Sequence, residues 1–268
     1  MGVKHFGLSF AFGNAEALAA YDFGLLSKLR SLQEMSDETT GKQYKRRYLV
    51  LGIQAWYGNF ESEKEQLAKI IHNISVTHPM DMLVLYTHLL DDRPTTQCVV
   101  AGPTIYDNSL PLPLPSMVST VELMGQAKIP DTVTVLFSLN VGATMFQLPG
   151  RTGKSTVNYG DACWDVGTVM YEDTCQGREL HTVEYVDKDL VMMLKPQSIQ
   201  FQPLILYENH TTMEMKMDRV FDMIERKNFG WSLNYVDKDD IRGRCSGSET
   251  TSHPPFVAHV KNIIRRHR

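Results

Sequence analysis

The chain has 268 residues, of which 43% are hydrophobic and 22% are charged, an ordinary composition for a globular protein. A chain of this length forms one large domain or two small ones. Its net charge of −4 gives no reason to expect a nucleic acid or an anionic membrane as partner. No run of eighteen apolar residues occurs, so the sequence predicts no transmembrane helix.

Apolar runs and amphipathic stretches alternate along the first half of the chain. The run at 5–12 predicts a strand close behind Met1, and such a start suggests an incomplete chain. A helix follows, and its predicted apolar face consists of Leu18, Tyr21, Leu25, Leu29 and Leu32. A polar loop at 36–45 leads to a second strand at 48–53. A capping box at 62–65 predicts the start of another helix, and a third strand follows at 82–87.

The second half of the chain changes its rhythm and then resumes it. After a helix around 117–124 and a strand at 132–139, residues 142–202 form shorter alternating segments, which predict an inserted subdomain. A helix at 213–224, a strand at 229–236 and a helix from Pro255 follow. Strands separated by helices favour right-handed βαβ units and a parallel sheet. The pattern fits both an open doubly wound sheet and part of an eight-stranded barrel.

Several motifs with a known chemistry are absent or incomplete. The segment 150–155 resembles a phosphate-binding loop, but Leu148 stands where that motif needs its first glycine. The chain contains neither a zinc-protease motif nor the nucleophile elbow of serine hydrolases. We interpret Asp237, Asp239 and Asp240 as a solvated turn rather than a metal site. The sequence therefore predicts no cofactor and no metal.

The four cysteines contain no Cys-x-x-Cys pair, which argues against a zinc or redox site. Their even number, together with glycosylation sequons at Asn73 and Asn209, favours a secreted protein with disulfides. The alternative is a cytosolic protein with four buried thiols. The residues alone leave both interpretations open.

The segment from Phe229 to Cys245 resembles the eighth barrel strand of family 18 glycoside hydrolases of the chitinase type, whose pattern is GG-x-x-x-W-x-x-D-x-DD-F-x-G-x-x-C. Residues 206–209 are similar to the family's Tyr-Asp-Asp/Asn turn. Upstream, residues 6–8, 48–55, 81–89 and 133–142 fall on the family's fourth to seventh strands. The resemblance implies an α/β fold, a partial TIM (β/α)8 barrel of strands four to eight with an inserted small α+β subdomain. The implied boundaries are 1–141 for strands four to seven, 142–207 for the insertion and 208–268 for the last helix-strand-helix.

The resemblance also shows which catalytic groups this chain lacks. The family's signature glutamate, which donates a proton to the glycosidic oxygen while the substrate's own acetamido group attacks, falls on Gly13. The signature aspartates fall on Phe6, Ser9 and Ala11. The remaining positions that the family uses for catalysis carry His88, Val141 and Asn234. Losing the general acid costs about 10²–10⁴ in rate, so we expect no chitinase activity.

Under the same resemblance, other residues acquire binding or structural roles. The residues expected to line the glycan site at the carboxyl ends of the strands are Gly13, Tyr86, His88, Asn140, Trp231 and Asn234. The family pairs a cysteine of the insertion with the one after the eighth strand, which implies a disulfide between Cys175 and Cys245. Cys98 and Cys163 then remain as the second pair. Trp56, Tyr57 and Trp164 could stack on sugars, but we expect each to pack in the core.

Three hypotheses for function follow from this resemblance. The first is a secreted, non-catalytic chitinase-like protein that binds chitin or other N-acetylglucosamine glycans. The second is a weakly active hydrolase with a displaced acid, such as Asp91 or Asp92. The third is a protein-interaction role on a retired hydrolase scaffold. Because the first three strands are absent under this alignment, we expect missing N-terminal strands or another chain to close the barrel.

Overall fold

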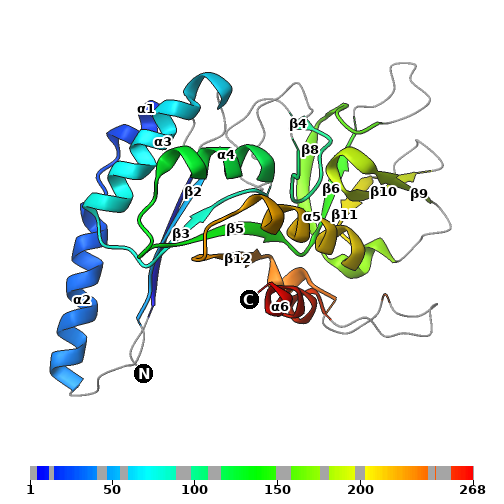
Figure 1. Ribbon diagram of the computed structural model, residues 1–268. Coiled ribbons are helices and arrows are strands. Elements are labelled where there is room, and N and C mark those ends of the chain that lie inside the picture. The colour runs from blue at the N-terminus through cyan, green and yellow to red at the C-terminus, as the bar shows by residue number, and fades with distance from the viewer. Residues whose placement is uncertain are drawn as a thin grey trace. The chain divides into compact units, whose positions relative to one another are not determined.

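The computed structural model describes most of the chain as helices, strands and their connections (Figure 1). The described residues are 5–11, 15–40, 47–54, 60–88, 98–107, 116–148, 158–175, 181–196, 203–240, 245 and 255–267. They belong to two compact units, which we treat one at a time. The first comprises Met1–Tyr86, Ser119–Phe137 and Arg226–Ser232, and the second comprises Thr87–Val118, Ser138–Glu225 and Leu233–Arg268. Within the described ranges, no helix has the length and apolarity needed to cross a bilayer.

A five-stranded sheet with the order β1-β2-β3-β5-β12 contains the long apolar runs of the sequence. Its strands are β1 (Phe6–Ala11), β2 (Leu49–Gln54), β3 (Met82–Leu85), β5 (Thr134–Asn140) and β12 (Phe229–Asn234). Strands β1, β2, β3 and β5 pair in parallel, with Ser9 opposite Gly52 and Gly52 opposite Val84. The last residues of β5 and β12 belong to the second unit. These strands confirm the predicted α/β class with a parallel sheet.

The helices of the first half are α1 (Ala15–Ala20), α2 (Gly24–Thr40), α3 (Phe60–Thr77) and α4 (Met117–Ala127), and α2 and α3 lie along the same side of the sheet (Figure 1). The single helix predicted after the first strand is wrong. Asp22 Oδ1 accepts a hydrogen bond of 2.8 Å from Gly24 N, and the chain restarts there as α2. The restart turns Phe23 and Leu26 inward and leaves Leu25 and Leu32 exposed.

Two predicted helix boundaries are also wrong. Helix α2 continues to Thr40, through the first part of the polar loop predicted at 36–45. Helix α3 begins at Phe60, so the proposed capping box at 62–65 lies inside the helix. Leu67, Ile71 and Ile74 form its buried apolar face, at the spacing of three to four residues that a helix requires. The 3.6-residue period located the helix but not its first turn.

A second five-stranded sheet, with the order β8-β6-β11-β10-β9, lies in the second unit. Its strands are β6 (Ala143–Gln147), β8 (Asp165–Val169), β9 (His181–Val186), β10 (Val191–Pro196) and β11 (Leu204–Tyr207). All its pairings are antiparallel, and its core includes Phe146, Val191, Met193, Leu204 and Leu206. Short 3-10 helices η1 (Tyr171–Thr174), η3 (Asp187–Asp189) and η4 (Val236–Lys238) join elements of this unit.

Helices α5 (His210–Met223) and α6 (Phe256–Arg266) complete the second unit. Asn209 caps α5, because its side chain accepts a hydrogen bond of 2.8 Å from Thr212 N. Asp239 caps α6 by accepting hydrogen bonds of 3.2 and 3.3 Å from the first two amides of that helix. The interpretation of this aspartate as part of a solvated turn is therefore wrong, since only 3% of it is exposed.

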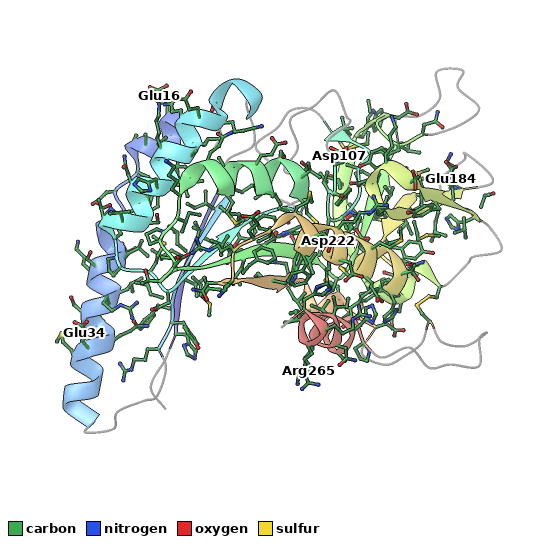
Figure 2. All side chains as sticks on the ribbon, in the orientation of Figure 1. Glu16, Glu34, Asp107, Glu184, Asp222 and Arg265 are labelled. Carbon is green, nitrogen blue, oxygen red and sulfur yellow. A yellow bond between two sulfur atoms is a disulfide. The ribbon has the colours of Figure 1, made fainter. Side chains whose placement is uncertain are left out.

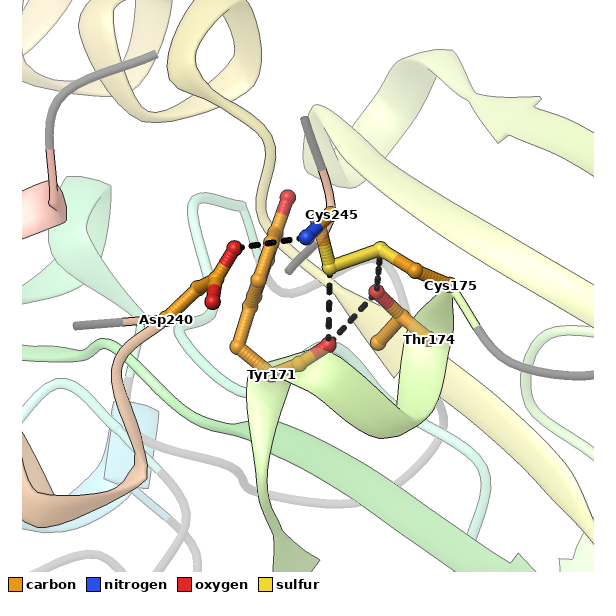
Figure 3. Close-up of a disulfide and its surroundings, with 5 residues drawn as sticks. All are labelled: Tyr171, Thr174, Cys175, Asp240 and Cys245. Atoms are coloured by element: carbon orange, nitrogen blue, oxygen red, sulfur yellow. Dashed lines mark hydrogen bonds between the residues drawn. A yellow bond between two sulfur atoms is a disulfide. The ribbon is translucent and has the colours of Figure 1, made fainter. Parts of the chain in front are cut away.

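Two disulfides link Cys98 to Cys163 and Cys175 to Cys245, the same two pairs that the sequence analysis expects. Cys98 and Cys163 are direct partners in the two-stranded sheet of β4 (Cys98–Val99) and β7 (Ala162–Cys163). Figure 3 shows the other disulfide beside η1. There Asp240 Oδ2 accepts a hydrogen bond of 2.9 Å from Cys245 N. Each disulfide therefore joins segments that are distant in the sequence.

Candidate functional site

The strands of the parallel sheet contain no ionisable side chain. Their sequences are FGLSFA, LVLGIQ, MLVL, TVLFSLN and FGWSLN. Glu16 and Glu34, two charged side chains of the first unit, lie on helices (Figure 2). Barrels of this kind carry their chemistry at the carboxyl ends of strands. On the described strands, the candidate site is therefore built from neutral groups.

In the first unit, Tyr86 lies across the sheet next to Gly52. A Cβ atom at Gly52 would lie 2.7 Å from Tyr86 Oη and 2.9 Å from Cε2, so only glycine admits this close approach. The Tyr86 hydroxyl forms a hydrogen bond of 2.7 Å with Ser9 Oγ on β1. The resemblance assigns an aspartate to the position of Ser9. In this chain that position carries a hydroxyl group, which is hydrogen-bonded to the hydroxyl group of Tyr86.

In the second unit, Ser138 organises the carboxyl end of β5. Its Oγ accepts a hydrogen bond of 2.7 Å from Thr87 N and lies 2.7 Å from His88 Nδ1. The Thr87 hydroxyl donates to the Ser138 carbonyl at 2.6 Å. Complete burial lowers the pKa of His88 to about 3, because the site disfavours the charged imidazolium. His88 is therefore neutral at physiological pH.

Thr104 links this region to the next segment of the chain. Thr104 and His88 form an antiparallel bridge, and Thr104 Oγ1 accepts a hydrogen bond of 2.9 Å from Asn140 N. Asn140 Oδ1 accepts one of 2.8 Å from Gly142 N, whereas Asn140 Nδ2 has no hydrogen-bond partner within the described ranges. The set of Thr87, His88, Thr104, Ser138 and Asn140, which we call the neutral cluster, is fully buried.

The end of β12 adds two partly exposed residues to the same unit. The Asn234 carbonyl accepts a hydrogen bond of 3.2 Å from Val141 N, and Val141 itself is buried. Tyr235 adopts the left-handed conformation, with φ of 58°, which costs a residue with a side chain about 1–2 kcal/mol. Its ring packs edge-to-face on His88 with centroids 5.9 Å apart. The strained backbone therefore places an aromatic ring against the neutral cluster.

A second polar group in this unit is charged, and we call Tyr159, Asp189, Glu208 and Lys216 the charged cluster. Lys216 Nζ donates a hydrogen bond of 2.6 Å to Glu208 Oε1, and a second one to the Thr104 carbonyl. The Tyr159 hydroxyl donates to Asp189 Oδ2 at 2.6 Å. Asp189, Glu208 and Lys216 are at most 1% exposed.

Burial dominates the ionisation of the charged cluster. It raises the pKa of Glu208 to about 7, against the attraction of Lys216. It also raises the pKa values of Asp189 and Tyr159. No sequence motif pointed to this cluster. One signal was available, because Lys216 lies on the same face of α5 as the buried Met213 and Val220, and a lysine there requires a partner.

The remaining predicted residues lie in varied surroundings. Trp231 is 9% exposed and packs edge-to-face with Phe137 and Phe229, with centroids 6.2 and 5.3 Å away, as a core residue does. Trp164 is 72% exposed, so the expectation that it packs in the core is wrong. Phe6 and Ala11 lie on β1. The residues of earlier interest that fall outside the described ranges are Gly13, Trp56, Tyr57, Asp91 and Asp92, together with 150–155.

The two sequons differ in their surroundings. Asn73 is an exposed residue in the last turns of α3. Asn209 is half-buried, and its Oδ1 is engaged in the cap of α5. The side-chain nitrogen that a glycan would modify is not the atom that makes this cap. Glycosylation at Asn73 and Asn209 stays a prediction.

Searches against models of protein families and against curated proteins found no match. Solved structures do match. An immunomodulatory active chitinase from Trichuris suis is 14% identical, with a TM-score of 0.61, over 97% of this chain and 68% of that chain. Human YKL-39, described as a pseudo-chitinase with retained chitooligosaccharide binding, is 14% identical, with a TM-score of 0.62, over 98% and 69%. A family 18 chitinase from Cycas revoluta in complex with (GlcNAc)3 is 13% identical, with a TM-score of 0.61, over 90% and 66%.

At these identities the likeness concerns the fold. The chain has the mixed α/β fold of family 18 chitinases and chitinase-like proteins, consistent with a partial TIM-like barrel. The described chain spans 66–69% of the length of these three structures. The resemblance to this family found in the sequence is thereby shown at the level of three-dimensional structure.

Proposed function

We propose that this chain is a non-catalytic chitinase-like protein that binds chitin or other N-acetylglucosamine glycans. The observation that carries the proposal is the absence of any acid from the described strands of the parallel sheet and from the neutral cluster. A general acid must lie within hydrogen-bonding reach of the glycosidic oxygen. The scaffold is that of a glycan-cleaving family, while the groups at its strand ends suit binding without proton transfer.

Neutral polar groups suit an uncharged sugar, because hydroxyl and acetamido groups need donors and acceptors rather than counter-charges. We assign a ligand contact to Tyr86 in the first unit and, separately, to Asn234 in the second unit, both of which are partly exposed. We assign His88, Asn140 and Trp231 supporting roles, since all three are buried. The substitutions at Phe6, Ser9, Ala11, Gly13 and Val141 then explain why binding would not lead to cleavage.

We further propose that the protein is secreted and that its barrel strands are the fourth to eighth of the family. Two disulfides support an oxidising compartment. The antiparallel sheet supports an inserted α+β subdomain at 142–207, because its strands begin at Ala143 and end at Tyr207. The barrel segments would then be 1–141 and 208–268.

The proposal is tested by measuring binding and cleavage on the same preparation. We expect calorimetric titration with (GlcNAc)4 to show binding, and a fluorogenic N-acetylglucosamine oligomer to release no product. Tyr86→Phe and Asn234→Ala should each weaken binding about 3–30-fold, the effect of one lost hydrogen bond. Asp222→Asn on the exposed face of α5 (Figure 2) is the matched control and should change nothing. No binding to any glycan would overturn the proposal in favour of a protein-interaction role.

One observation favours a weakly active hydrolase as the second candidate. Glu208 has a pKa of about 7, a value suited to a general acid. However, its carboxylate pairs with Lys216, and only 1% of the residue is exposed. Product release that Glu208→Gln abolishes would establish this alternative.

A further inference from the structure

The segment 98–107 is attached to the rest of the second unit through the charged cluster. Its beginning is joined to β7 by the disulfide of Cys98. Further along, the Thr104 carbonyl accepts a hydrogen bond from Lys216 Nζ, and Tyr106 N donates one of 2.6 Å to Asp189 Oδ1. A Cβ atom at Gly102 would overlap the Asp189 carboxylate, so the backbone lies directly against it. The carboxylate and the ammonium group therefore hold this segment at two points.

The charges of the cluster do not balance when every group has its ordinary charge. Asp189 and Glu208 contribute two negative charges and Lys216 contributes one positive charge, which leaves −2 + 1 = −1. The site is closed to solvent, and a buried charge without a counter-charge is strongly unfavourable. A proton on one carboxylate removes this imbalance and leaves the ion pair of the other carboxylate intact.

Further titratable groups act on the cluster from neighbouring elements. Tyr159 faces Asp189 from the turn before β7, and its phenol is a hydrogen-bond donor rather than a source of charge. Tyr185 on β9 interacts electrostatically with Glu208, Lys216, Asp187 and Arg219. Asp187 and Arg219 have opposite charges, and both are exposed. These outer groups therefore do not supply the missing positive charge inside the cluster.

We propose that the charged cluster takes up one proton from solvent when the chain folds at neutral pH, and that this protonated cluster clamps segment 98–107 and positions Thr104. Thr104 is also a member of the neutral cluster, where it binds Asn140 N and bridges to His88. The proton would thus influence the geometry of the neutral cluster through the position of Thr104. This last step rests on the proposed function, whereas the clamp itself does not.

The sign of the pH dependence follows from the raised pKa of Glu208. Folding moves this pKa upward from 4.5 to about 7, so the folded state binds the proton more tightly than the unfolded state. The resulting stabilisation is fully present below pH 4.5. It is lost as the pH rises through the window between 4.5 and 7.

Glu208→Gln separates this proposal from an ordinary ion pair. Glutamine can present its carbonyl oxygen to Lys216 and its amide to the hydroxyl of Thr212, which now donates to Glu208 at 3.0 Å. The variant cluster is neutral without a proton, since one carboxylate and one ammonium group remain. An ordinary ion pair predicts a less stable variant at every pH, whereas the proposal predicts a variant that is at least as stable as the wild type at pH 8.

The experiment is urea unfolding at a series of pH values. The quantity compared is the unfolding constant of the wild type divided by that of Glu208→Gln. This ratio should rise on the order of tenfold from pH 5.5 to pH 8. Asp189→Asn should show the same trend, and Asp222→Asn on the exposed face of α5 should follow the wild type. Equal pH profiles for wild type and Glu208→Gln would overturn the proposal. Failure of both amide variants to fold at pH 8 would overturn it as well.

Hydrogen exchange tests the clamp without any sugar. The measured quantity is the protection of the peptide that contains Ile105 and Tyr106, corrected for intrinsic exchange rates. From pH 5.5 to pH 8 this protection should fall in the wild type, and the fall should be on the order of tenfold larger than in Glu208→Gln. Equal loss in both proteins would show that segment 98–107 is not clamped by the proton. If the clamp is observed but (GlcNAc)4 does not bind at any pH, only the proposed function fails.

Discussion

The neutral cluster and the charged cluster lie in the same compact unit but differ in charge, and the carbonyl of Thr104, a member of the neutral cluster, accepts a hydrogen bond from Lys216 of the charged cluster. The neutral cluster and the three charged side chains Asp189, Glu208 and Lys216 are all at most 1% exposed. The first holds hydroxyl, amide and neutral imidazole groups at the ends of strands. The second holds two carboxylates, a lysine and a phenol. The second unit therefore has buried acids, whereas the described strands of the parallel sheet and the neutral cluster contain none.

Under the proposed function, a suitable pKa does not by itself make a catalytic acid. Glu208 has a pKa of about 7, yet its carboxylate is bound by Lys216 and Thr212 and excluded from solvent. The described strands lie where this fold carries its chemistry, but none of their side chains is ionisable. Chemistry on this scaffold would require both properties in one residue.

The largest effect is expected from removing the ammonium group of the charged cluster. Lys216→Met leaves two buried carboxylates without a counter-charge, and we expect a loss of about 3–5 kcal/mol in the free energy of unfolding at pH 7.5. The loss should shrink at pH 5, where the carboxylates can take up protons. Lys188→Met, at an exposed lysine on η3, is the control. A loss below about 1 kcal/mol in urea unfolding would contradict a tightly coupled cluster.

A smaller effect is expected where the backbone of segment 98–107 lies against Asp189. Gly102→Ala places a methyl group on the carboxylate and 3.3 Å from the Thr104 carbonyl, which should cost about 1–3 kcal/mol. Gly125→Ala in α4 is matched to it, because a Cβ atom there meets nothing within 4 Å. Alanine should stabilise that helix by about 0.5–1 kcal/mol. If the midpoint temperature of thermal unfolding shifts in the same direction in both variants, the result would argue against the close contact at Gly102.

The neutral cluster should respond to mutation without a pH component. Ser138→Ala removes the acceptor of Thr87 N and the partner of His88 Nδ1, at a cost of about 1–2 kcal/mol. Because the pKa of His88 is about 3, the cost should be the same at pH 5.5 and pH 8. Ser31→Ala, at an exposed serine of α2, is the control. A cost that varies with pH would show that the two clusters are not distinct in charge.

The smallest effect is expected at Thr144, which is 2% exposed and whose hydroxyl has no hydrogen-bond partner in the described part of the chain. Thr144→Val keeps the shape and removes the unsatisfied group, so stability should be unchanged or rise by up to about 1 kcal/mol. Thr212→Val removes a hydroxyl that donates to Glu208 and should be destabilising. If Thr144→Val were the more costly of the two, an additional partner of this hydroxyl would be implied.

Local patterns predicted most of the elements near this site. The apolar runs of β2, β3 and β5 were recognisable because strands buried on both faces need continuous hydrophobic residues. The helix break at Asp22 was missed, because a single side chain bonding to Gly24 N ends one helix and starts the next. That local event changed which leucines are buried.

Residue type alone did not predict which tryptophans and lysines are buried. Trp231 packs on Phe137, whereas Trp164 is largely exposed. Lys216 is fully buried, although lysine is among the residues least often found inside. In each case the outcome depends on partners from distant parts of the chain, which no local period encodes.

The sequence by itself determined the alternation of strands and helices, the absence of acids from the sheet and the motifs that resemble a chitinase. These properties follow from local hydrophobic periods and from residue identity. Only the tertiary structure brought Asp189, Glu208 and Lys216 together and closed them off from water. The physical reason is that burial and charge pairing are properties of neighbours in space, and Tyr159 and Lys216 are far apart along the chain.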